Sequence, residues 1–259
     1  MKNLIRVSIG LAFSAAIFAF APAQTGLEIA VKAEKADNGW VSSSNRLVMT
    51  LTNRNGQITI RQMHGYSLEV ENEGDKSMTI FDTPRDVKGT ASMTFTHKTG
   101  DDDQWLFLPA IDRVKRISSS NKSGPFMGSE FAFEDLSSQE VEKYTYKYIS
   151  DESVNGQDCY KLERYPVSKT SGYKRNIVWY NKDNFRPEKV EFYDRKDALL
   201  KTLTYSKYNQ YASEYWRANT MKMVNHQNGK ETSLAFSDYQ FGIDLVDSDF
   251  SQNALKRAK

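Results

Sequence analysis

The sequence contains only one cysteine, Cys159, and only three histidines, His64, His97 and His226. A single thiol cannot form an internal disulfide bond, so the folded state must be stabilised by its hydrophobic core. The chain also lacks the G-x-S-x-G, S-x-x-K and H-E-x-x-H motifs that mark common serine and zinc hydrolases. We therefore expect a protein that is not an enzyme and that uses no metal or cofactor. Cys159 lies inside a strand pattern and is expected to be a passive, partly buried thiol.

Long hydrophobic runs are absent after the first residues of the chain. Lys2 and Arg6 precede an apolar run, Val7–Ala21, which ends in Ala21-Pro22-Ala23. This run is shorter than the roughly 18 residues of a membrane span and has the form of a secretory signal peptide with an A-x-A cleavage site. We expect a signal peptide at 1–23, cleaved near Ala23, and a single exported domain at 24–259. Because no cysteine follows the cleavage site, N-terminal lipidation is not expected.

The mature protein is expected to have no excess of either charge. Removal of Lys2 and Arg6 reduces Lys+Arg from 35 to 33, which equals the 33 Asp+Glu of the chain. A protein that binds nucleic acid through its overall charge needs a basic surface. The composition therefore gives no support to a nucleic-acid partner.

A period-two alternation of apolar and polar residues runs through most of the chain and predicts an antiparallel β protein. The dipeptides Asn55-Gly56, Asn155-Gly156 and Asn228-Gly229 are typical of hairpin turns. We expect about eleven strands, at 46–51, 58–60, 93–95, 105–108, 144–150, 159–164, 176–180, 189–193, 200–208, 221–226 and 232–239. So many strands in one sheet must curl or close.

Helices are expected only near the two ends of the domain. Thr25 and Glu28 have the spacing of a capping box, and Asp37-Asn38-Gly39 ends the helical pattern that follows. A second short helix is expected at 247–255. The apolar stripe of the first helix either seals the core or covers a ligand cavity.

Several strands carry large rings on both faces, or repeatedly on one face. Tyr144, Tyr146 and Tyr148 share a face, and Val178-Trp179-Tyr180 puts bulky side chains on both sides of its strand. A curved sheet that holds an apolar ligand on its concave side would need this pattern. A sandwich with one buried face and tyrosines at its surface is the alternative, and the pattern alone leaves both open.

The stretch between Ile117 and Val141 has no strand alternation, although it contains five large apolar residues. A connection of this length in a compact domain is usually a lid, a binding loop or a disordered segment, and the aromatic content disfavours disorder. The glycines Gly124 and Gly128 supply the conformational freedom that an opening lid needs. We expect the apolar residues to face either the domain core or a cavity that they cover: Phe126, Met127, Phe131, Phe133 and Leu136.

Two short charged stretches lie just before this segment. Asp101–Asp103 lacks the ligand spacing of an EF-hand loop and is expected to be a solvated hairpin tip. Arg113, Lys115 and Arg116 form a local basic cluster. Three interpretations of this cluster remain open: a solvated strand surface, ion pairs with Glu130, Glu134 or Asp135, or a contact with a lipid headgroup or partner protein, for which Arg113 and Arg116 are the candidates.

The order and spacing of several segments carry a resemblance to a known family. These segments are Phe81-Asp82-Thr83-Pro84, Lys88-Gly89-Thr90, Trp105–Ala110, Arg113–Arg116, Ser123–Phe131, Glu134-Asp135-Leu136, Cys159–Leu162 and Trp216. Together they resemble the periplasmic outer-membrane lipoprotein-sorting proteins, which are similar to the LolA/LolB-type lipoprotein carriers. The resemblance covers nearly all of the mature chain.

This resemblance implies an incompletely closed antiparallel β-barrel around an apolar cavity, with short helices and a loop as its lid. It implies a periplasmic carrier that shields the acyl chains of a lipid or lipoprotein on the way to the outer membrane, with an inner-membrane exporter of the resistance-nodulation-division type as a partner. We also expect the protein to be a monomer. The alternative is a non-catalytic periplasmic adaptor for such an exporter. The expected ligand-binding residues of the lid and cavity are Trp105, Phe126, Met127, Phe131, Phe133 and Leu136.

Overall fold

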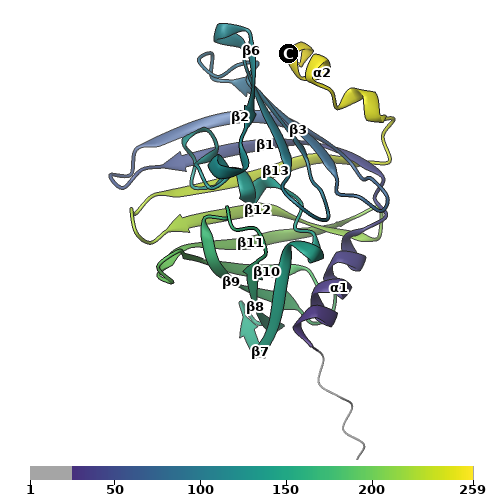
Figure 1. Cartoon of the computed structure of the whole chain (residues 1–259), viewed down its shortest axis with the longest axis vertical. Helices are drawn as coiled ribbons and strands as arrows, with labels where there is room; N and C mark the ends of the chain where they lie inside the picture. The colour runs from purple at the N-terminus through teal and green to yellow at the C-terminus, as the bar shows by residue number, and fades with distance from the viewer. Residues whose placement is uncertain (1–24, 259) are drawn as a thin grey trace, which may run out of the picture.

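The computed structural model describes residues 25–258, so the expected signal peptide lies outside the described residues. One antiparallel sheet dominates the structure (Figure 1). Its thirteen strands are β1 (Ser42–Thr52), β2 (Ile58–Leu68), β3 (Lys76–Thr83), β4 (Ala91–Phe95), β5 (Asp103–Leu108), β6 (Arg113–Ile117), β7 (Tyr144–Val154), β8 (Gln157–Pro166), β9 (Tyr173–Asn181), β10 (Pro187–Asp194), β11 (Leu199–Tyr211), β12 (Tyr215–Asn225) and β13 (Glu231–Phe241).

The helices are few and short. The two α-helices are α1 (Gly26–Asp37) and α2 (Gln252–Arg257). Six 3-10 helices complete the elements: η1 (Pro109–Ile111), η2 (Ser119–Asn121), η3 (Phe126–Gly128), η4 (Phe133–Leu136), η5 (Val141–Lys143) and η6 (Asp247–Asp249). Between residues 25 and 258, no helix combines the length and apolar character needed to cross a membrane.

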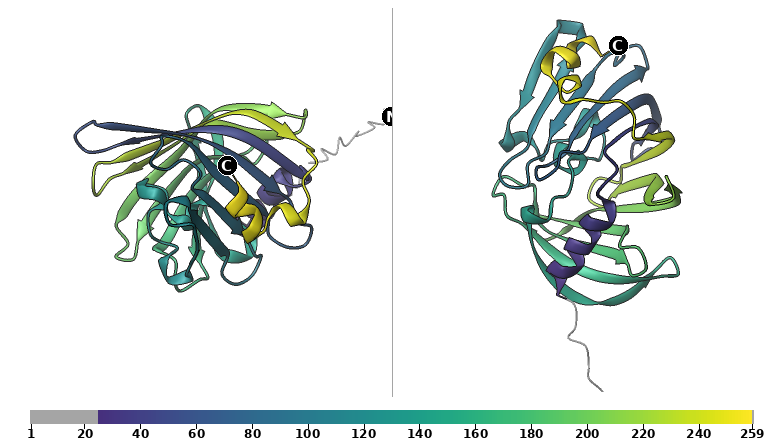
Figure 2. Two further views of the ribbon diagram at one scale, coloured as in Figure 1. Left: turned by 90° about the horizontal axis from the view of Figure 1, so that it is seen from above. Right: turned by 90° about the vertical axis from the view of Figure 1, so that its right-hand side faces the viewer.

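The strand order shows that the barrel is open, because the two end strands do not pair with each other. The sheet runs β6-β5-β4-β3-β2-β1-β13-β12-β11-β10-β9-β8-β7, so two meanders meet where β1 pairs with β13. The two edge strands, β6 and β7, are therefore consecutive in the chain. The connection between them, residues 118–143, has to cross the open side of the curved sheet. Figure 2 shows this teal connection on the inner side of the curve.

Helix α1 forms where the sequence predicts it. The Thr25 hydroxyl accepts a hydrogen bond from the Glu28 backbone N–H at 3.2 Å, and the Glu28 carboxylate accepts one from the Thr25 N–H at 2.8 Å, which completes the capping box. The helix begins directly against β7: a Cβ on Gly26 would lie 2.8 Å from the backbone of Lys147. Only glycine permits this close approach, which places α1 at one end of the concave side of the sheet.

The expected eleven strands are all present, and β3 and β6 are additional. Strand β3 does not alternate clearly because it is buried on both faces: Ile80 packs in one hydrophobic cluster and Phe81 in another. The basic run Arg113–Ile117 forms β6, an edge strand, where exposed cations protect the unpaired backbone from pairing with other chains. The turn between β7 and β8 has positive φ at both Asn155 and Gly156, as an Asn-Gly hairpin requires.

Two hydrophobic clusters occupy opposite faces of the sheet. The larger one joins strands of both meanders to the β6–β7 connection and includes Met49, Met63, Phe81, Phe126, Phe131, Val178, Leu203 and Leu234. The smaller one joins β3, β4 and β5 to the C-terminal segment through Phe250 and Leu255. A cavity lies beside the larger cluster, between the strands, the β6–β7 connection and α1.

Candidate functional site

A cavity of about 550 Å³ lies between the concave side of the sheet, the β6–β7 connection and α1. Its volume falls within the roughly 300 to 1,000 Å³ of typical small-molecule sites. Large apolar side chains from both meanders form much of its wall, including Leu47, Met49, Met63, Val178, Val190, Leu203, Met221, Leu234 and Phe236. Such a wall of aromatic, methionine and aliphatic side chains favours an apolar ligand. The flexible methionine side chains can also adapt to the shape of that ligand.

We call residues 122–137 the covering segment. It folds back on itself: the Phe126 N–H donates to the Phe131 carbonyl at 2.7 Å, and the Phe133 N–H donates to the Gly124 carbonyl at 3.1 Å. At its tip, Met127 and Gly128 both have positive φ, 50° and 78°. Glycine adopts this conformation without strain, whereas methionine does so rarely.

A buried ion pair holds the covering segment on the second meander. Lys201 Nζ lies 2.6 Å from Asp135 Oδ2, and the two side chains are 5% and 2% exposed. The same Nζ donates to the Glu130 carbonyl at 2.9 Å, and the Tyr173 hydroxyl donates to Asp135 Oδ1 at 2.7 Å. These bonds satisfy both charges where water is excluded, which a buried pair needs in order to be stable.

Further hydrogen bonds attach the covering segment to both halves of the sheet. Arg61 of β2 donates to the Met127 carbonyl at 2.6 Å, and Gln104 of β5 donates to the Phe133 carbonyl at 3.0 Å. On the other side, Asn225 of β12 donates to Glu130 Oε2 at 2.7 Å. The segment therefore bridges the gap of the open barrel as a fixed cover, and its opening would require several buried polar contacts to break.

Most of the predicted ligand-binding residues lie at the cavity. Phe126, Phe131, Phe133 and Leu136 line it, and Met127 packs against the same cluster. Phe126 and Phe131 are each only 2% exposed, so they also serve as core residues. Trp105 borders the cavity, but its ring packs edge-on against Phe95 in the cluster beneath α2. The role of the six predicted residues in ligand binding stays a prediction.

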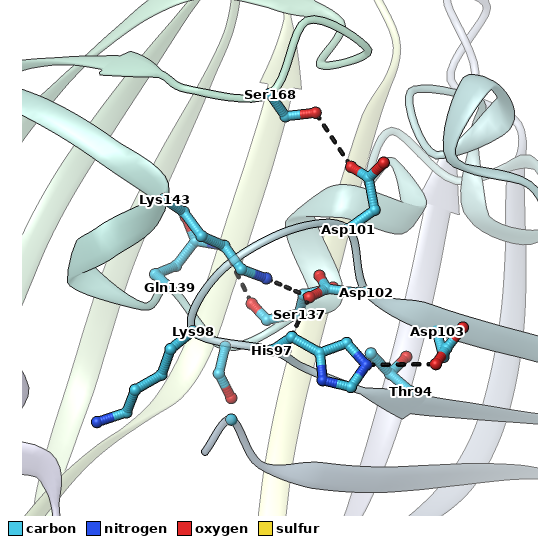
Figure 3. A network of polar contacts seen from close by, with 12 residues as sticks. Thr94, His97, Lys98, Asp101, Asp102, Asp103, Ser137, Gln139, Lys143 and Ser168 are labelled. Atoms are coloured by element: carbon cyan, nitrogen blue, oxygen red, sulfur yellow. Dashed lines mark hydrogen bonds and ion pairs between the residues drawn. The ribbon is translucent and has the colours of Figure 1, made fainter. Parts of the chain in front are cut away.

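The run Asp101–Asp103 lies at the end of the hairpin loop between β4 and β5, with Asp101 exposed as expected, but its carboxylates also make several ion pairs (Figure 3). Asp101 pairs with Lys122 at 3.0 Å, Asp102 pairs with Lys143, and Asp103 pairs with Arg116 and lies 3.3 Å from His97. Lys122 and Lys143 lie at the two ends of the β6–β7 connection. The aspartates therefore fix both ends of this connection to the loop between β4 and β5.

The basic cluster does not contact the acidic residues of the covering segment, so that interpretation is wrong. Arg116 pairs with Asp103 on the surface, and Arg113 is exposed. The three acids have other partners: Glu130 accepts from Asn225, Glu134 accepts from the Gly172 N–H at 2.8 Å, and Asp135 pairs with Lys201. The sequence showed charges that are near in the chain, but tertiary contacts determine the pairs. A contact of Arg113 and Arg116 with a headgroup or partner stays a prediction.

Acidic side chains gather where α1 borders the cavity. Glu34, Asp75 and Glu140 line this end, and Glu140 is 8% exposed. Burial, followed by the nearby carboxylates of Asp75 and Glu34, raises the pKa of Glu140 to about 7. Burial also raises the pKa of Asp75 to about 6. Both groups titrate close to neutral pH, so the charge at this end of the cavity depends on pH.

The charged residue Arg164 is among the cavity residues that were not predicted from the sequence. Arg164 of β8 lines the cavity and is 5% exposed. In the strand it lies two positions from Leu162, so the alternation that put Leu162 on an apolar face could have placed Arg164 on the same face. The burial of a charged side chain is rare, so a charged residue in a strand is ordinarily expected to be exposed.

Comparisons with known proteins give a consistent result along nearly the whole chain. A family model with the description "Uncharacterized protein" matches residues 73–257. A crystal structure of an outer membrane lipoprotein-sorting protein domain from Vibrio parahaemolyticus is 56% identical, with a TM-score of 0.88 over 90% of this chain and 98% of that one. A DUF1329 family protein from Desulfovibrio piger is 32% identical, with a TM-score of 0.84 over 89% and 97% of the two chains.

A LolA superfamily protein from Nitrosomonas europaea shares the fold at 24% identity, with a TM-score of 0.72 over 90% of this chain and all of that one. A search among curated proteins finds no match. The expected LolA-like fold, an antiparallel barrel that does not close, is confirmed.

Proposed function

From the premise that this chain belongs to the same family as the outer membrane lipoprotein-sorting protein domain of Vibrio parahaemolyticus, we propose that it is a carrier of acyl chains. The cargo is a lipid or a lipoprotein, and the acyl chains occupy the cavity under the covering segment. The observation that carries this proposal is the cavity itself: about 550 Å³ with a largely apolar wall inside a sheet that does not close.

The physical need for such a carrier comes from the cost of exposing hydrocarbon to water. Each methylene that leaves water contributes about 0.8 kcal/mol, so one acyl chain provides enough free energy for stable binding and also requires shelter. The methionines Met49, Met63 and Met221 on the cavity wall can adapt to chains of different length. This arrangement suits a carrier that recognises hydrocarbon and not one rigid molecule.

The compartment and the partners form the second part of the proposal. The chain is exported to the periplasm by a signal peptide cleaved near Ala23 and works there as a monomer without catalysis. It receives its cargo from an inner-membrane exporter of the resistance-nodulation-division type and moves it towards the outer membrane. The apolar run Val7–Ala21 and the family relationship support the export, and the exposed Arg113 and Arg116 offer a surface for the exporter.

A fluorescence experiment tests the carrier function. The neutral probe N-phenylnaphthylamine is expected to bind delipidated protein with increased emission and to be displaced by long-chain lipids. Ala33, on α1, lines the cavity, whereas the exposed Val31 on the same helix does not. Ala33→Trp should fill the cavity and weaken probe binding at least about tenfold, and Val31→Trp should leave binding unchanged. Equal binding by both variants would contradict the proposal.

A further inference from the structure

Arg164 is an unusual component of an apolar cavity because it is charged, buried and without a carboxylate partner. Its Nη2 donates to the Gln139 side-chain oxygen at 2.9 Å, and its guanidinium lies 4.3 Å from the centre of the Tyr144 ring. Its Nε is also buried, and no described protein group accepts a hydrogen bond from it. Arg164 is the one buried arginine among the described residues.

Other arginines of the second meander do have carboxylate partners. Arg175 pairs with Glu163 at 3.0 Å and with Asp197 at 2.7 Å, and Arg186 pairs with Glu188 at 2.9 Å. A guanidinium remains charged at every physiological pH, so its burial without a counter-ion is costly. The position of Arg164 therefore favours an anion from outside the chain.

Hydroxyl groups around Arg164 add neutral donors to this positive centre. Tyr146 is the cross-strand neighbour of Arg164, and Tyr180 and Tyr205 also lie close to the guanidinium. No hydrogen bond joins these three hydroxyls to another described group, and all three side chains line the cavity. Burial raises the pKa of Tyr146 and of Tyr205 far above the ordinary value, so both remain protonated donors.

The amide of Asn176 lies in the same region. Asn176 is the cross-strand neighbour of Arg164 on β9 and is fully buried. Its Oδ1 and Nδ2 both lack a hydrogen-bond partner among the described groups. Three unsatisfied atoms on two adjacent residues are a concentration of polar groups that a well-packed core normally avoids. Of the two residues, Arg164 lines the cavity and is the one that a polar ligand group can reach.

We propose that Arg164 binds the anionic head of a single-chain lipid whose hydrocarbon chain occupies the rest of the cavity. This inference rests on the proposed function and makes the substrate class more specific. Arginine is well suited to the role because its planar guanidinium can bind two oxygens of a carboxylate or phosphate at once. The volume of about 550 Å³ favours one chain over the larger diacyl lipids.

The acidic groups near the covering segment do not exclude an anion. Asp135 is neutralised by its ion pair with Lys201. Glu140 has a pKa raised to about 7 by burial, so it is partly protonated at neutral pH. The positive charge of Arg164 has no such compensation within the described part of the chain.

The experiment compares three amphiphiles with the same chain length on delipidated protein: palmitate, hexadecyl phosphate and the neutral hexadecanol. Each is titrated against bound N-phenylnaphthylamine. A charge-assisted hydrogen bond to a buried arginine is expected to make at least one anionic lipid bind about tenfold to a hundredfold more tightly than hexadecanol. The two anions distinguish a carboxylate head from a phosphate head.

Substitutions assign this preference to Arg164. Arg164→Gln should weaken binding of the anions at least about tenfold more than it weakens binding of hexadecanol, whereas Arg164→Lys should retain part of the preference. Equal affinity of wild-type protein for all three amphiphiles would overturn the inference while leaving the carrier function intact. Failure of all three to displace the probe would contradict the carrier function itself.

Folding of the variants is checked by thermal unfolding before binding is measured. Should Arg164→Gln fail to fold, the comparison of headgroups on wild-type protein still decides whether an anion is preferred. Arg164→Lys then assigns the preference, since a change in the ratio of palmitate to hexadecyl phosphate affinity is expected when a planar guanidinium is replaced by a point charge. An unchanged ratio would contradict the role of Arg164.

Discussion

Lys201 and Asp135 form an ion pair of 2.6 Å in which neither side chain is more than 5% exposed. Lys201 belongs to strand β11 of the sheet and Asp135 to the covering segment, so this pair joins the cover to the wall of the cavity. Removal of one partner leaves an uncompensated buried charge. We expect Lys201→Met or Asp135→Leu alone to lower the free energy of unfolding by about 3 to 5 kcal/mol.

The double variant Lys201→Met/Asp135→Leu separates the pair from its packing. It should recover much of the lost stability, because apolar side chains of similar size often replace a buried pair without loss. The surface pair of Arg46 and Asp238, whose side chains are 71% and 68% exposed, is the control, and Arg46→Ala should change stability by less than about 1 kcal/mol. Urea unfolding curves measure the stability of the four variants and of the wild type. Single variants as stable as the wild type would show that the pair does not hold the cover.

The titration of Glu140 predicts a pH-dependent stability. Its pKa is raised from 4.5 to about 7, first by burial and then by Asp75 and Glu34, while Lys143 and Lys98 act in the opposite direction. A carboxyl group with a raised folded-state pKa favours folding in its protonated form. The loss of folding stability caused by ionised Glu140 is therefore absent below the unfolded-state pKa. This loss increases as the pH rises from about 4.5 to about 7.

Glu140→Gln should consequently stabilise the protein by about 1 to 3 kcal/mol at pH values above about 7 and have little effect below about pH 4.5. Chemical denaturation across this range measures the difference. The exposed Glu71→Gln is the control and should show no such dependence on pH. A stabilisation by Glu140→Gln that is the same at both ends of the range would mean that Glu140 is not titrating near neutral pH.

Phe126 and Phe133 separate the structural role of the covering segment from its contact with cargo. Phe126 is 2% exposed, and Phe126→Ala should cost about 3 to 5 kcal/mol of stability. Phe133 is only partly buried and lines the cavity. Its ring packs edge-on against the ring of Phe126, with 5.4 Å between the ring centroids. Phe133→Ala should lower the free energy of unfolding by only about 1 to 2 kcal/mol. The free energy of probe binding should fall by more than this amount. Stability is measured on delipidated protein, since bound lipid would mask the loss. Normal probe binding by Phe133→Ala would assign this ring to packing alone.

The exposed basic side chains of β6 lead to a prediction about the partner. Arg113 and Arg116 are exposed on an edge strand, and among residues 25–258 the ion-pair partner of Arg116 is Asp103. Arg116→Glu should weaken binding to the proposed inner-membrane exporter, and the difference from wild type should diminish as salt is raised, because screening removes exposed electrostatic interactions. Co-purification from solubilised membranes at several salt concentrations measures this effect, with the exposed Arg46→Glu as a charge-matched control. Equal effects of both substitutions would mean that β6 is not a specific contact surface.

Local signals allowed the sequence to predict much of the fold. The capping box of Thr25 and Glu28 and the turn at Asn155-Gly156 depend on residues close in the chain, and both form as expected. Strand β3 was missed because both of its faces are buried, which removes the alternation that identifies a half-buried strand. Cys159 is completely buried, and burial raises the pKa of its thiol to about 11, which agrees with the expected inert side chain.

The sequence indicated the covering segment but not its attachments. The apolar residues from Phe126 to Leu136 required an apolar surface, and the structure supplies it. The partners of the charged residues depend instead on contacts between distant parts of the chain: Asp135 with Lys201, and Arg116 with Asp103. Arg164 could not be recognised for the same reason, because its hydrogen bond to Gln139 joins parts of the chain that are distant in sequence. Local patterns do not encode such pairings.

Native mass spectrometry of protein purified from the periplasm, without a delipidation step, tests the carrier function most directly. We expect wild-type protein and Val31→Trp to retain a non-covalent adduct that fragments into acyl-chain lipid or lipopeptide. Ala33→Trp, in which the new side chain fills the cavity, should be detected predominantly as folded protein without a bound ligand. A wild-type protein that carries no such adduct, or an adduct equally abundant on Ala33→Trp, would contradict the conclusion that this cavity carries acyl chains.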